Sequence, residues 1–198
     1  MYKPEGIMPA LVTPFTDDGK QINEEALRSL VKRCIELGAN GLVPCGTTGE
    51  FVNLTIEEKK KTIDIVIDET NGKAKVVAGT GASGTSQALE MTKYAKDAGA
   101  DAVLIVTPFY LKPADRGIYE HYDTIASQVD MPIILYNIPQ VTGVPLPWQM
   151  VEDLAQIPNI VGVKDSSGQL AFILAVLEKV RDKINVMCGH DEIVVGAL

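Results

Sequence analysis

The sequence alternates short runs of β-branched and other apolar residues with longer segments of helical period. The starts of these runs recur every roughly 24 to 34 residues, which is the spacing of a strand–helix–strand unit. A chain built from such units folds either as a doubly wound sheet or as a (β/α)8 barrel. The predicted strands lie at 7–12, 41–44, 75–78, 102–106, 132–136, 160–164 and 184–187.

The segments between the strands carry helix boundary signals. Asn23 is a plausible N-cap for the first helix, and Thr55 and Glu58 have the spacing of a capping box. Gly99 supplies a C-terminal signal after the third helix. These signals support six helices and the start of a seventh, at 24–37, 56–70, 85–98, 115–129, 147–156, 169–181 and 191–198.

Polar residues and glycines gather directly after nearly every predicted strand. A barrel places its chemistry at the carboxyl ends of many strands, whereas a doubly wound sheet concentrates it at one switch point. The sequence therefore predicts an α/β fold, a (β/α)8 TIM barrel with seven strands and about six and a half helices. We expect one domain over residues 1–198.

The composition argues against several classes of partner. The chain has 18 Lys and Arg against 26 Asp and Glu, so its formal net charge is −8, whereas non-specific nucleic-acid binding needs a basic field. No apolar run approaches the roughly 18 residues of a membrane helix. The three cysteines form no CxxC motif, and we expect a cytoplasmic protein without a targeting segment. Two histidines are too few for most imidazole-based metal sites, although carboxylates alone could still hold a metal.

Lys164 is the strongest candidate for catalysis. It ends the apolar strand 160–164 and shares a strand face with Gly162, which leaves room beside the lysine for a substrate or a bent side chain. An amine in an apolar barrel mouth loses hydration, and a neutral amine is the nucleophile that forms a Schiff base with a carbonyl. The alternative interpretation is a structural lysine that pairs with Asp165 or another carboxylate.

Two tyrosines follow strands in the same sense. Tyr136 ends the strand 132–136, and Tyr110 follows the strand 102–106. A phenol at such a position can pass protons between a substrate and solvent. Either residue could instead be a core aromatic whose hydroxyl bonds to the backbone.

Two glycine-rich loops are candidate binding elements. The Gly-Thr-Thr-Gly-Glu segment at 46–50, which contains Thr47 and Thr48, combines amide groups with two hydroxyls and suits a carboxylate or a phosphate. Its threonines could equally satisfy local backbone groups. The segment 79–84 matches G-x-G-x-x-G, but no acidic residue follows at the next strand end, so we interpret it as a loop that lines a pocket.

Cys45 and His190 also lie at strand ends. No histidine is near Cys45 in the sequence, so a small buried hydrophobe is favoured over a nucleophile. His190 follows the strand 184–187, where a solvated loop histidine and a substrate contact are both open.

Three motifs in chain order resemble those of the dihydrodipicolinate synthase / N-acetylneuraminate lyase family. They are the Gly-Thr-Thr-Gly-Glu segment at 46–50, Tyr-Asn-Ile-Pro at 136–139 and Gly-Val-Lys-Asp at 162–165. The resemblance covers residues 6–198 and implies a class I, Schiff-base (β/α)8 enzyme. It implies a cytoplasmic lyase or synthase that condenses pyruvate with an aldehyde, as in lysine biosynthesis, and needs no metal or organic cofactor beyond the covalent imine.

The resemblance also implies roles for individual residues. Lys164 resembles the lysine that forms the imine with pyruvate or another 2-oxo acid, and Tyr136 resembles the tyrosine that shuttles protons. Thr47 matches the threonine of the proton relay, and Thr47 and Thr48 match the residues that hold the pyruvate carboxylate. Tyr110 is similar to a second tyrosine that in many members reaches in from a neighbouring subunit, which implies a homo-oligomer, a dimer or a tetramer. Gly189 matches a glycine near the substrate.

One position departs from the pattern of the synthases. They usually carry an arginine two residues after the motif proline, and this chain has Val141 there. The departure leaves the aldehyde partner open, and a 2-keto-3-deoxy sugar acid aldolase is the close alternative.

Length is the second departure. A (β/α)8 barrel typically needs about 250 residues, so we expect the chain to be truncated before strand eight. A non-catalytic or inactive barrel fragment that binds a 2-oxo acid is therefore a further alternative.

Overall fold

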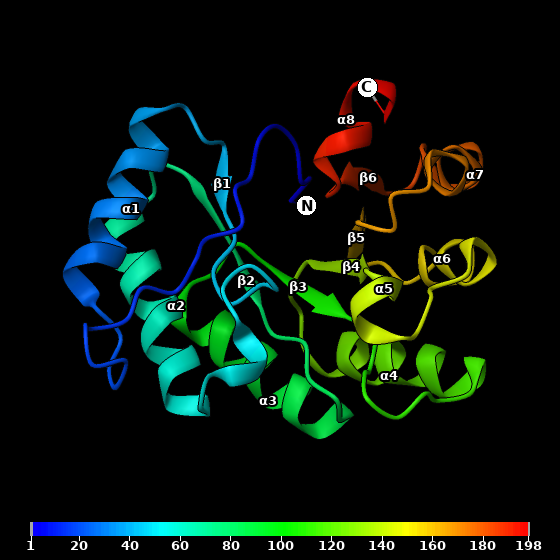
Figure 1. Ribbon diagram of the computed structural model, residues 1–198. Helices are drawn as coiled ribbons and strands as arrows, with labels where there is room; N and C mark the ends of the chain where they lie inside the picture. The colour runs from blue at the N-terminus through cyan, green and yellow to red at the C-terminus, as the bar shows by residue number, and fades with distance from the viewer. Residues whose placement is uncertain (1, 198) are drawn as a thin grey trace. The chain divides into compact units, whose positions relative to one another are not determined.

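The computed structural model describes residues 2–197, which form two compact units. Unit 1 comprises Met1–Pro4, Gly81–Glu90 and Ile105–Leu198, and unit 2 comprises Glu5–Thr80 and Met91–Leu104. The division falls inside helix α3 (Thr85–Ala98) and strand β3 (Ala102–Val106). Figure 1 labels the elements along the chain.

Unit 2 is built on parallel strands. Strand β1 (Gly41–Leu42) pairs with β2 (Lys75–Gly79), with Leu42 opposite Val76. Strand β2 also pairs with β3, with Ala78 opposite Val103. Helices α1 and α2 pack against one another, and their apolar faces join the strands in a core that includes Leu27 and Val66. The elements are α1 (Glu24–Glu36), β1 (Gly41–Leu42), η1 (Phe51–Asn53), α2 (Ile56–Thr70) and β2 (Lys75–Gly79), with the adjoining parts of α3 and β3.

Local capping explains where the helices of unit 2 begin. The Asn23 side chain accepts a hydrogen bond from the amide of Ala26 at 3.0 Å. The Thr55 hydroxyl accepts from the amide of Glu58, and the Glu58 carboxylate accepts in return from the amide of Thr55 at 2.8 Å. Both caps satisfy amides that the first helical turn leaves without a partner. The caps predicted at Asn23 and Thr55 are therefore confirmed.

Unit 1 repeats the strand–helix pattern. Strand β4 pairs in parallel with β5, and β5 pairs in parallel with β6. Helix α6 packs against both α4 and α7 (Figure 1). Every residue of β4 is buried, as expected for a parallel strand covered on both faces. The elements are α4 (Asp115–Gln128), β4 (Ile133–Asn137), α5 (Pro139–Thr142), α6 (Trp148–Leu154), β5 (Ile160–Asp165), α7 (Leu170–Val180), β6 (Asn185–Cys188), η2 (Asp191–Ile193) and α8 (Val194–Ala197).

The predicted fold class is confirmed, with one strand fewer than expected. Within residues 2–197 the structure has six strands, and the predicted strand at 7–12 is reduced to an isolated bridge from Ala10 to Val43. The amide of Leu11 donates to the carbonyl of Val43, but Pro9, two residues earlier on the same side, lacks an amide proton, so the ladder loses its next donor. Two compact units can belong to one domain, so the single domain truncated before strand eight stays a prediction.

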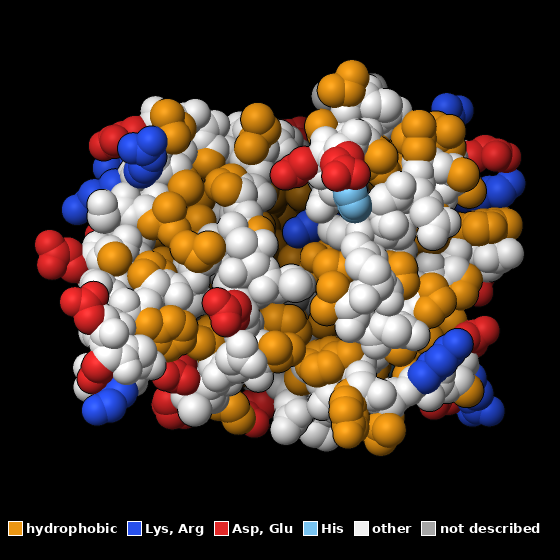
Figure 2. All heavy atoms as spheres, in the orientation of Figure 1, with side chains coloured by type: hydrophobic (Ala, Val, Ile, Leu, Met, Phe, Trp, Pro, Cys, Tyr) orange, Lys and Arg blue, Asp and Glu red, His pale blue; other side chains and the backbone are white. Residues whose placement is uncertain are grey.

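Two surface properties bear on the expected partners. Among residues 2–197, no helix is both long and apolar enough to cross a membrane. Acidic and basic side chains are interspersed on the face drawn in Figure 2, and no broad basic patch gathers there.

Candidate active site

Lys164 and Tyr136 lie side by side at the carboxyl ends of β5 and β4. They are direct partners in the parallel register of these strands, and Lys164 Nζ lies 4.6 Å from the centroid of the Tyr136 ring. Tyr136 is 5% exposed, whereas Lys164 is half-buried. Neighbouring parallel strands end at the same edge, so two residues that end such strands meet. The structure therefore brings together an amine and a phenol that the sequence singled out separately.

Asp165 does not serve as the counter-ion of Lys164. Its carboxylate accepts hydrogen bonds from Asn137 Nδ2 at 2.6 Å and from Ser167 Oγ at 2.7 Å. Among the described residues, none of the ion pairs includes Lys164 or Asp165. The alternative in which Lys164 pairs with Asp165 is therefore wrong. Asn137 is the residue that the sequence reasoning missed, although its position directly after Tyr136 was the available signal.

Gly189 leaves the space that the Lys164 side chain occupies. A Cβ at position 189 would lie 2.5 Å from Lys164 Cε, and it would also clash with the Ser166 hydroxyl. Such distances are too short for real Cβ atoms, so a larger residue would push the lysine side chain aside. Gly189 thus lies beside Lys164, and its expected place near the substrate stays a prediction.

Gly162 has a different role from the one expected. A Cβ at this position would lie 2.9 Å from Pro4 Cγ and 3.2 Å from the carbonyl oxygen of Asn185. Pro4 is held there because the Asn185 side chain donates to its carbonyl at 2.9 Å. The expectation that Gly162 leaves room for a substrate is wrong, because Pro4 fills that space. The sequence could not show this contact, which joins residues 181 positions apart.

Thr47 and Thr48 belong to unit 2, where they lie in the turn between β1 and η1. The amides of Gly49 and Phe51 both donate to the carbonyl of Gly46, and the amide of Glu50 donates to that of Thr47. Thr48 is exposed and Thr47 is half-buried. The amides of Gly49 and Glu50 are thus used within the turn and are not available to bind an anion. Their place in one site with Lys164 stays a prediction.

Tyr110 extends into solvent on a strained backbone. Its side chain is 92% exposed, and its φ of 75° lies in the left-handed region that non-glycine residues seldom adopt. The interpretation of Tyr110 as a core aromatic is wrong. A large aromatic residue held outward at a conformational cost is typical of a contact with another molecule.

The second glycine-rich loop is explained by packing. A Cβ at Gly79 would clash with the carbonyl of Cys45, and a Cβ at Gly81 would lie 2.9 Å from the backbone nitrogen of Val106. Cys45 itself is 2% exposed, and burial raises the pKa of its thiol to about 12. The prediction that Cys45 is a buried hydrophobe is confirmed, since a thiol with this pKa is a poor nucleophile near pH 7.

His190 packs over the loop that precedes α7. A Cβ at Gly168 would lie 3.1 Å from both Cδ2 and Nε2 of His190. The ring is half-buried. The imidazole is thus an ordered loop residue one position after Gly189, and a contact with substrate stays a prediction.

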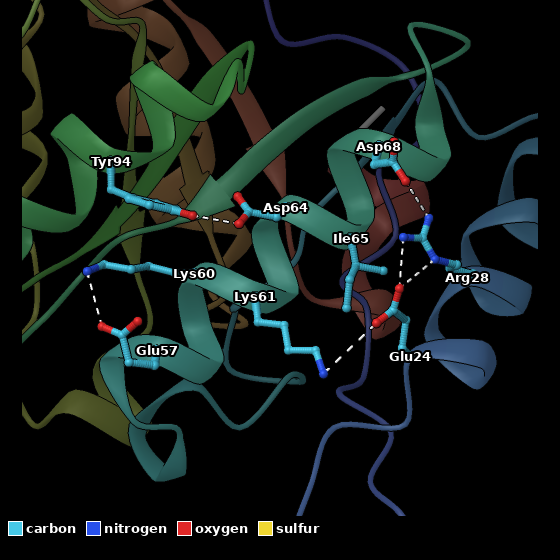
Figure 3. Close-up of a pocket in the computed structure, with 9 residues that line it drawn as sticks. All are labelled: Glu24, Arg28, Glu57, Lys60, Lys61, Asp64, Ile65, Asp68 and Tyr94. Atoms are coloured by element: carbon cyan, nitrogen blue, oxygen red, sulfur yellow. Dashed lines mark hydrogen bonds and ion pairs between the residues drawn. The ribbon is translucent and has the colours of Figure 1, made fainter.

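A charged surface pocket of about 600 Å³ lies in unit 2, between α1, α2 and the part of α3 that carries Tyr94 (Figure 3). Its charges are matched internally. Arg28 bonds Glu24 and Asp68, Lys60 pairs with Glu57, and the Tyr94 hydroxyl donates to Asp64 at 2.6 Å. Most of its charged groups already have partners, so the pocket is a groove between packed helices rather than a centre of chemistry.

Residues 2–197 contain no group of three or more His, Cys, Asp or Glu side chains placed to hold a metal ion. The chemical groups at the β4–β5 edge are a primary amine, a phenol and a buried amide–carboxylate pair.

The fold and this edge define a protein of the (β/α)8-barrel class with a lysine and a tyrosine paired at the carboxyl ends of neighbouring strands. Residues 3–198 match the model of the Dihydrodipicolinate synthetase family, and the chain belongs to this family. The match confirms the family resemblance found in the sequence motifs.

Curated relatives and solved structures agree with this assignment. A 4-hydroxy-tetrahydrodipicolinate synthase of Methanopyrus kandleri is 46% identical over 198 residues, which are 100% of this chain and 66% of the relative. The relative of the same name from Methanothrix thermoacetophila is 45% identical over 98% of this chain and 65% of its own length. The chain thus spans about two thirds of the curated relatives that it matches.

Two solved structures illustrate the similarity of the fold. The chloride-inhibited dihydrodipicolinate synthase from Acinetobacter baumannii, complexed with pyruvate, has a TM-score of 0.94 and 44% identity, over 97% of this chain and 66% of that one. YagE from E. coli K12, a family member in complex with pyruvate, has a TM-score of 0.93 and 31% identity, over 97% of this chain and 65% of that one.

Proposed function

We propose that this chain forms a Schiff base between Lys164 and pyruvate and acts as a lyase or synthase of the dihydrodipicolinate synthase kind. The observation that carries the proposal is the Lys164–Tyr136 pair, with Nζ 4.6 Å from the ring centroid at the carboxyl ends of β5 and β4. The names of the relatives and the pyruvate bound in two similar structures give independent support.

The proposed reaction begins with attack of the neutral Lys164 amine on the C2 carbonyl of pyruvate. Water leaves, and the protonated imine withdraws electrons from C3, which then loses a proton and becomes an enamine carbon. The enamine adds to the carbonyl carbon of an aldehyde, and hydrolysis of the new imine releases the product and regenerates the amine. Tyr136, whose ring centroid lies 4.6 Å from Lys164 Nζ, is proposed to carry protons to and from the reacting atoms. No metal or organic cofactor enters these steps.

Further residues have proposed roles in binding. Thr47 and Thr48 hold the pyruvate carboxylate, with Thr47 also relaying protons, and Gly189 lies near the substrate. Tyr110 completes the relay in a neighbouring subunit of a homo-oligomer, which is a dimer or a tetramer. Its outward position on a left-handed backbone supports this arrangement. A cytoplasmic location is proposed from the cysteines, all three of which are free.

A second candidate function differs only in the aldehyde. Val141 lies in α5 and is 62% exposed, so this position offers an apolar side chain and no cation for a second carboxylate. A 2-keto-3-deoxy sugar acid aldolase would use the same imine in the cleavage direction and would not need that cation. A comparison of aspartate-semialdehyde condensation with 2-keto-3-deoxygluconate cleavage discriminates the two functions.

Borohydride reduction in the presence of pyruvate tests the shared mechanism. We expect the protein to gain the mass of one reduced pyruvate adduct, and we expect Lys164→Ala to abolish the gain. Lys179→Ala is the matched control, because Lys179 also lies over an aromatic ring, at 5.9 Å from the centroid of Trp148, but on the outer helix α7. An adduct that persists in Lys164→Ala would disprove the proposed role of this lysine.

Calorimetric titration with pyruvate tests the remaining alternative, an inactive fragment that binds a 2-oxo acid. Binding heat without an adduct on reduction would favour such a fragment over an enzyme.

A further inference from the structure

Asn137 and Asp165 form a polar pair directly after Tyr136 and Lys164. The register of β4 and β5 sets Tyr136 opposite Lys164 and Asn137 opposite Asp165. Consecutive side chains of a strand point to opposite faces of the sheet. The amide–carboxylate pair therefore lies on the face opposite to the amine and the phenol.

The hydrogen bonds of this pair are complete and specific. Asn137 Nδ2 donates to Asp165 Oδ1 at 2.6 Å, and Asn137 Oδ1 accepts from the amide of Leu146 at 3.0 Å. Asp165 Oδ2 accepts from the hydroxyl of Ser167 at 2.7 Å and from its amide at 3.2 Å. Each oxygen of the pair thus has a donor, and the pair ties the two strand ends to the loops that follow them.

Burial makes this arrangement hard to replace. Asn137 is 2% exposed and Asp165 is 0% exposed. Among residues 2–197, no Lys or Arg forms an ion pair with Asp165, so the carboxylate is held by amides and a hydroxyl alone. A buried carboxylate is costly unless its donors are in place. The strand ends therefore favour the one geometry in which these bonds are made.

The backbone continues the connection around the site. The amide of Ser166 donates to the carbonyl of Asn137 at 2.8 Å, and the amide of Gly189 donates to the carbonyl of Asp165 at 2.7 Å. Gly189 in turn is the residue whose missing Cβ leaves space for Lys164. The residues behind the reactive pair are thus joined across β4, β5 and the end of β6.

We infer that Asn137 and Asp165 are positioning residues that hold Tyr136 and Lys164 in register for imine formation. The inference rests on the proposed function of Lys164. A displacement of about 1 Å in a reacting group can cost roughly 100-fold in rate, so the fixed relation of the two strand ends matters for chemistry as well as for stability.

An exchange of the two functional groups tests the inference. Asn137→Asp sets two carboxylates against one another without a donor between them, which breaks the pair. The double variant N137D/D165N restores every bond with the roles reversed. The carboxylate at position 137 accepts from Leu146 and from the amide at position 165, whose oxygen accepts from Ser167.

The first readout is the rate of pyruvate trapping by borohydride at saturating pyruvate. We expect N137D to lower the trapping rate by at least roughly 10-fold, and we expect the double variant to restore the trapping rate to within about 3-fold of wild type. Asn159→Ala is the matched control, because Asn159 precedes the opposite end of β5 and donates to the carbonyls of Ala126, Val129 and Met131. It should lower the melting temperature and leave the trapping rate unchanged.

The second readout does not depend on catalysis. Acetic anhydride labels Lys164, and mass spectrometry measures the labelling rate relative to that of Lys179. We expect N137D to change this ratio by at least about 3-fold and the double variant to restore it. If N137D does not fold, Asp165→Asn replaces it. In this variant the side-chain oxygen at position 165 still accepts from Asn137, but its NH2 group faces the amide and hydroxyl of Ser167, which are donors themselves. We therefore expect the same change in the labelling ratio of Lys164 to Lys179.

The two readouts separate failure of the inference from failure of the proposed function. A wild-type chain that pyruvate does not label would overturn the proposed imine, and the acetylation ratios alone would then decide the inference. Single variants with wild-type trapping and wild-type labelling would overturn the inference. So would a double variant that folds but remains as impaired as the single variants.

Discussion

His121 makes the stability of unit 1 sensitive to acid. The residue lies in α4 and is 2% exposed, with Nδ1 3.0 Å from the Thr85 hydroxyl. Its Nε2 has no hydrogen-bond partner. Burial disfavours the imidazolium and lowers the pKa of His121 to about 4, against 6.5 for an exposed histidine.

The direction of the effect follows from proton binding. Between pH 6.5 and 4 the unfolded chain binds a proton at His121 that the folded chain does not, so the free energy of unfolding falls as pH falls. Each pKa unit is worth 1.36 kcal/mol. The loss attributable to His121 is therefore about 2 kcal/mol at pH 5 and about 3 kcal/mol at pH 4, with little further loss below that.

The perturbation is His121→Phe. In the wild-type structure the rings of His121 and Tyr122 meet edge to face with their centroids 5.3 Å apart, and phenylalanine keeps an aromatic ring there. Phenylalanine has no group that binds a proton, so the titration at position 121 is removed. Urea unfolding of wild type and variant between pH 4 and pH 8 gives the difference in their free energies of unfolding at each pH. Both proteins have the same carboxylates, so the pH dependence that these carboxylates cause cancels in the difference. We expect the free energy of unfolding of the variant, relative to that of wild type, to rise by about 3 kcal/mol as the pH falls from 7 to 4. A difference that changes by less than about 1 kcal/mol over this range would refute the reasoning.

Three further substitutions have defined outcomes. Tyr136→Phe should leave the fold intact and slow pyruvate trapping by roughly 100-fold or more, because it removes one proton-transfer group; a trapping rate equal to that of wild type contradicts the role of the phenol. Gly189→Ala should destabilise the chain by about 1 to 3 kcal/mol and also slow trapping, since the new Cβ meets Lys164 Cε at 2.5 Å; normal labelling of Lys164 would show that the side chain is not displaced. Thr55→Ala should cost about 1 kcal/mol in urea unfolding with no effect on trapping, because only the cap of α2 is lost.

Local features of the molecule could be predicted because local energies decide them. The caps at Asn23 and Thr55 depend on residues within one helical turn, and the structure has both. The sequence singled out Tyr136 and Lys164 separately, and the structure pairs them because neighbouring parallel strands end at a common edge. The amide–carboxylate pair was missed because Asn137 and Asp165 were considered only as neighbours of the reactive residues, although the same register joins them.

Contacts between distant parts of the chain could not be predicted in this way. Pro4 fills the space beside Gly162 because Asn185 holds its carbonyl, and no local pattern marks that contact. The strand expected at 7–12 carries the right apolar residues, but hydrogen bonding along it is limited by Pro9, which lacks an amide donor. Apolar periodicity reports burial, whereas a ladder also needs amide donors at matching positions.

Glycines show most clearly why spacing alone gives an ambiguous signal. Gly79 lies in a segment that matches a nucleotide-binding pattern, and the backbone carbonyl of Cys45 occupies the place of its Cβ. At Gly189 the Ser166 hydroxyl and the Lys164 side chain occupy that place instead. Both glycines follow strands and both permit a close approach, but one admits a backbone and the other a reactive amine. The neighbour that fills the space decides between packing and chemistry, and that neighbour comes from another strand. If the proposed chemistry of Lys164 holds, it depends on pairs across strands, and the Asn137–Asp165 pair is the place to perturb it.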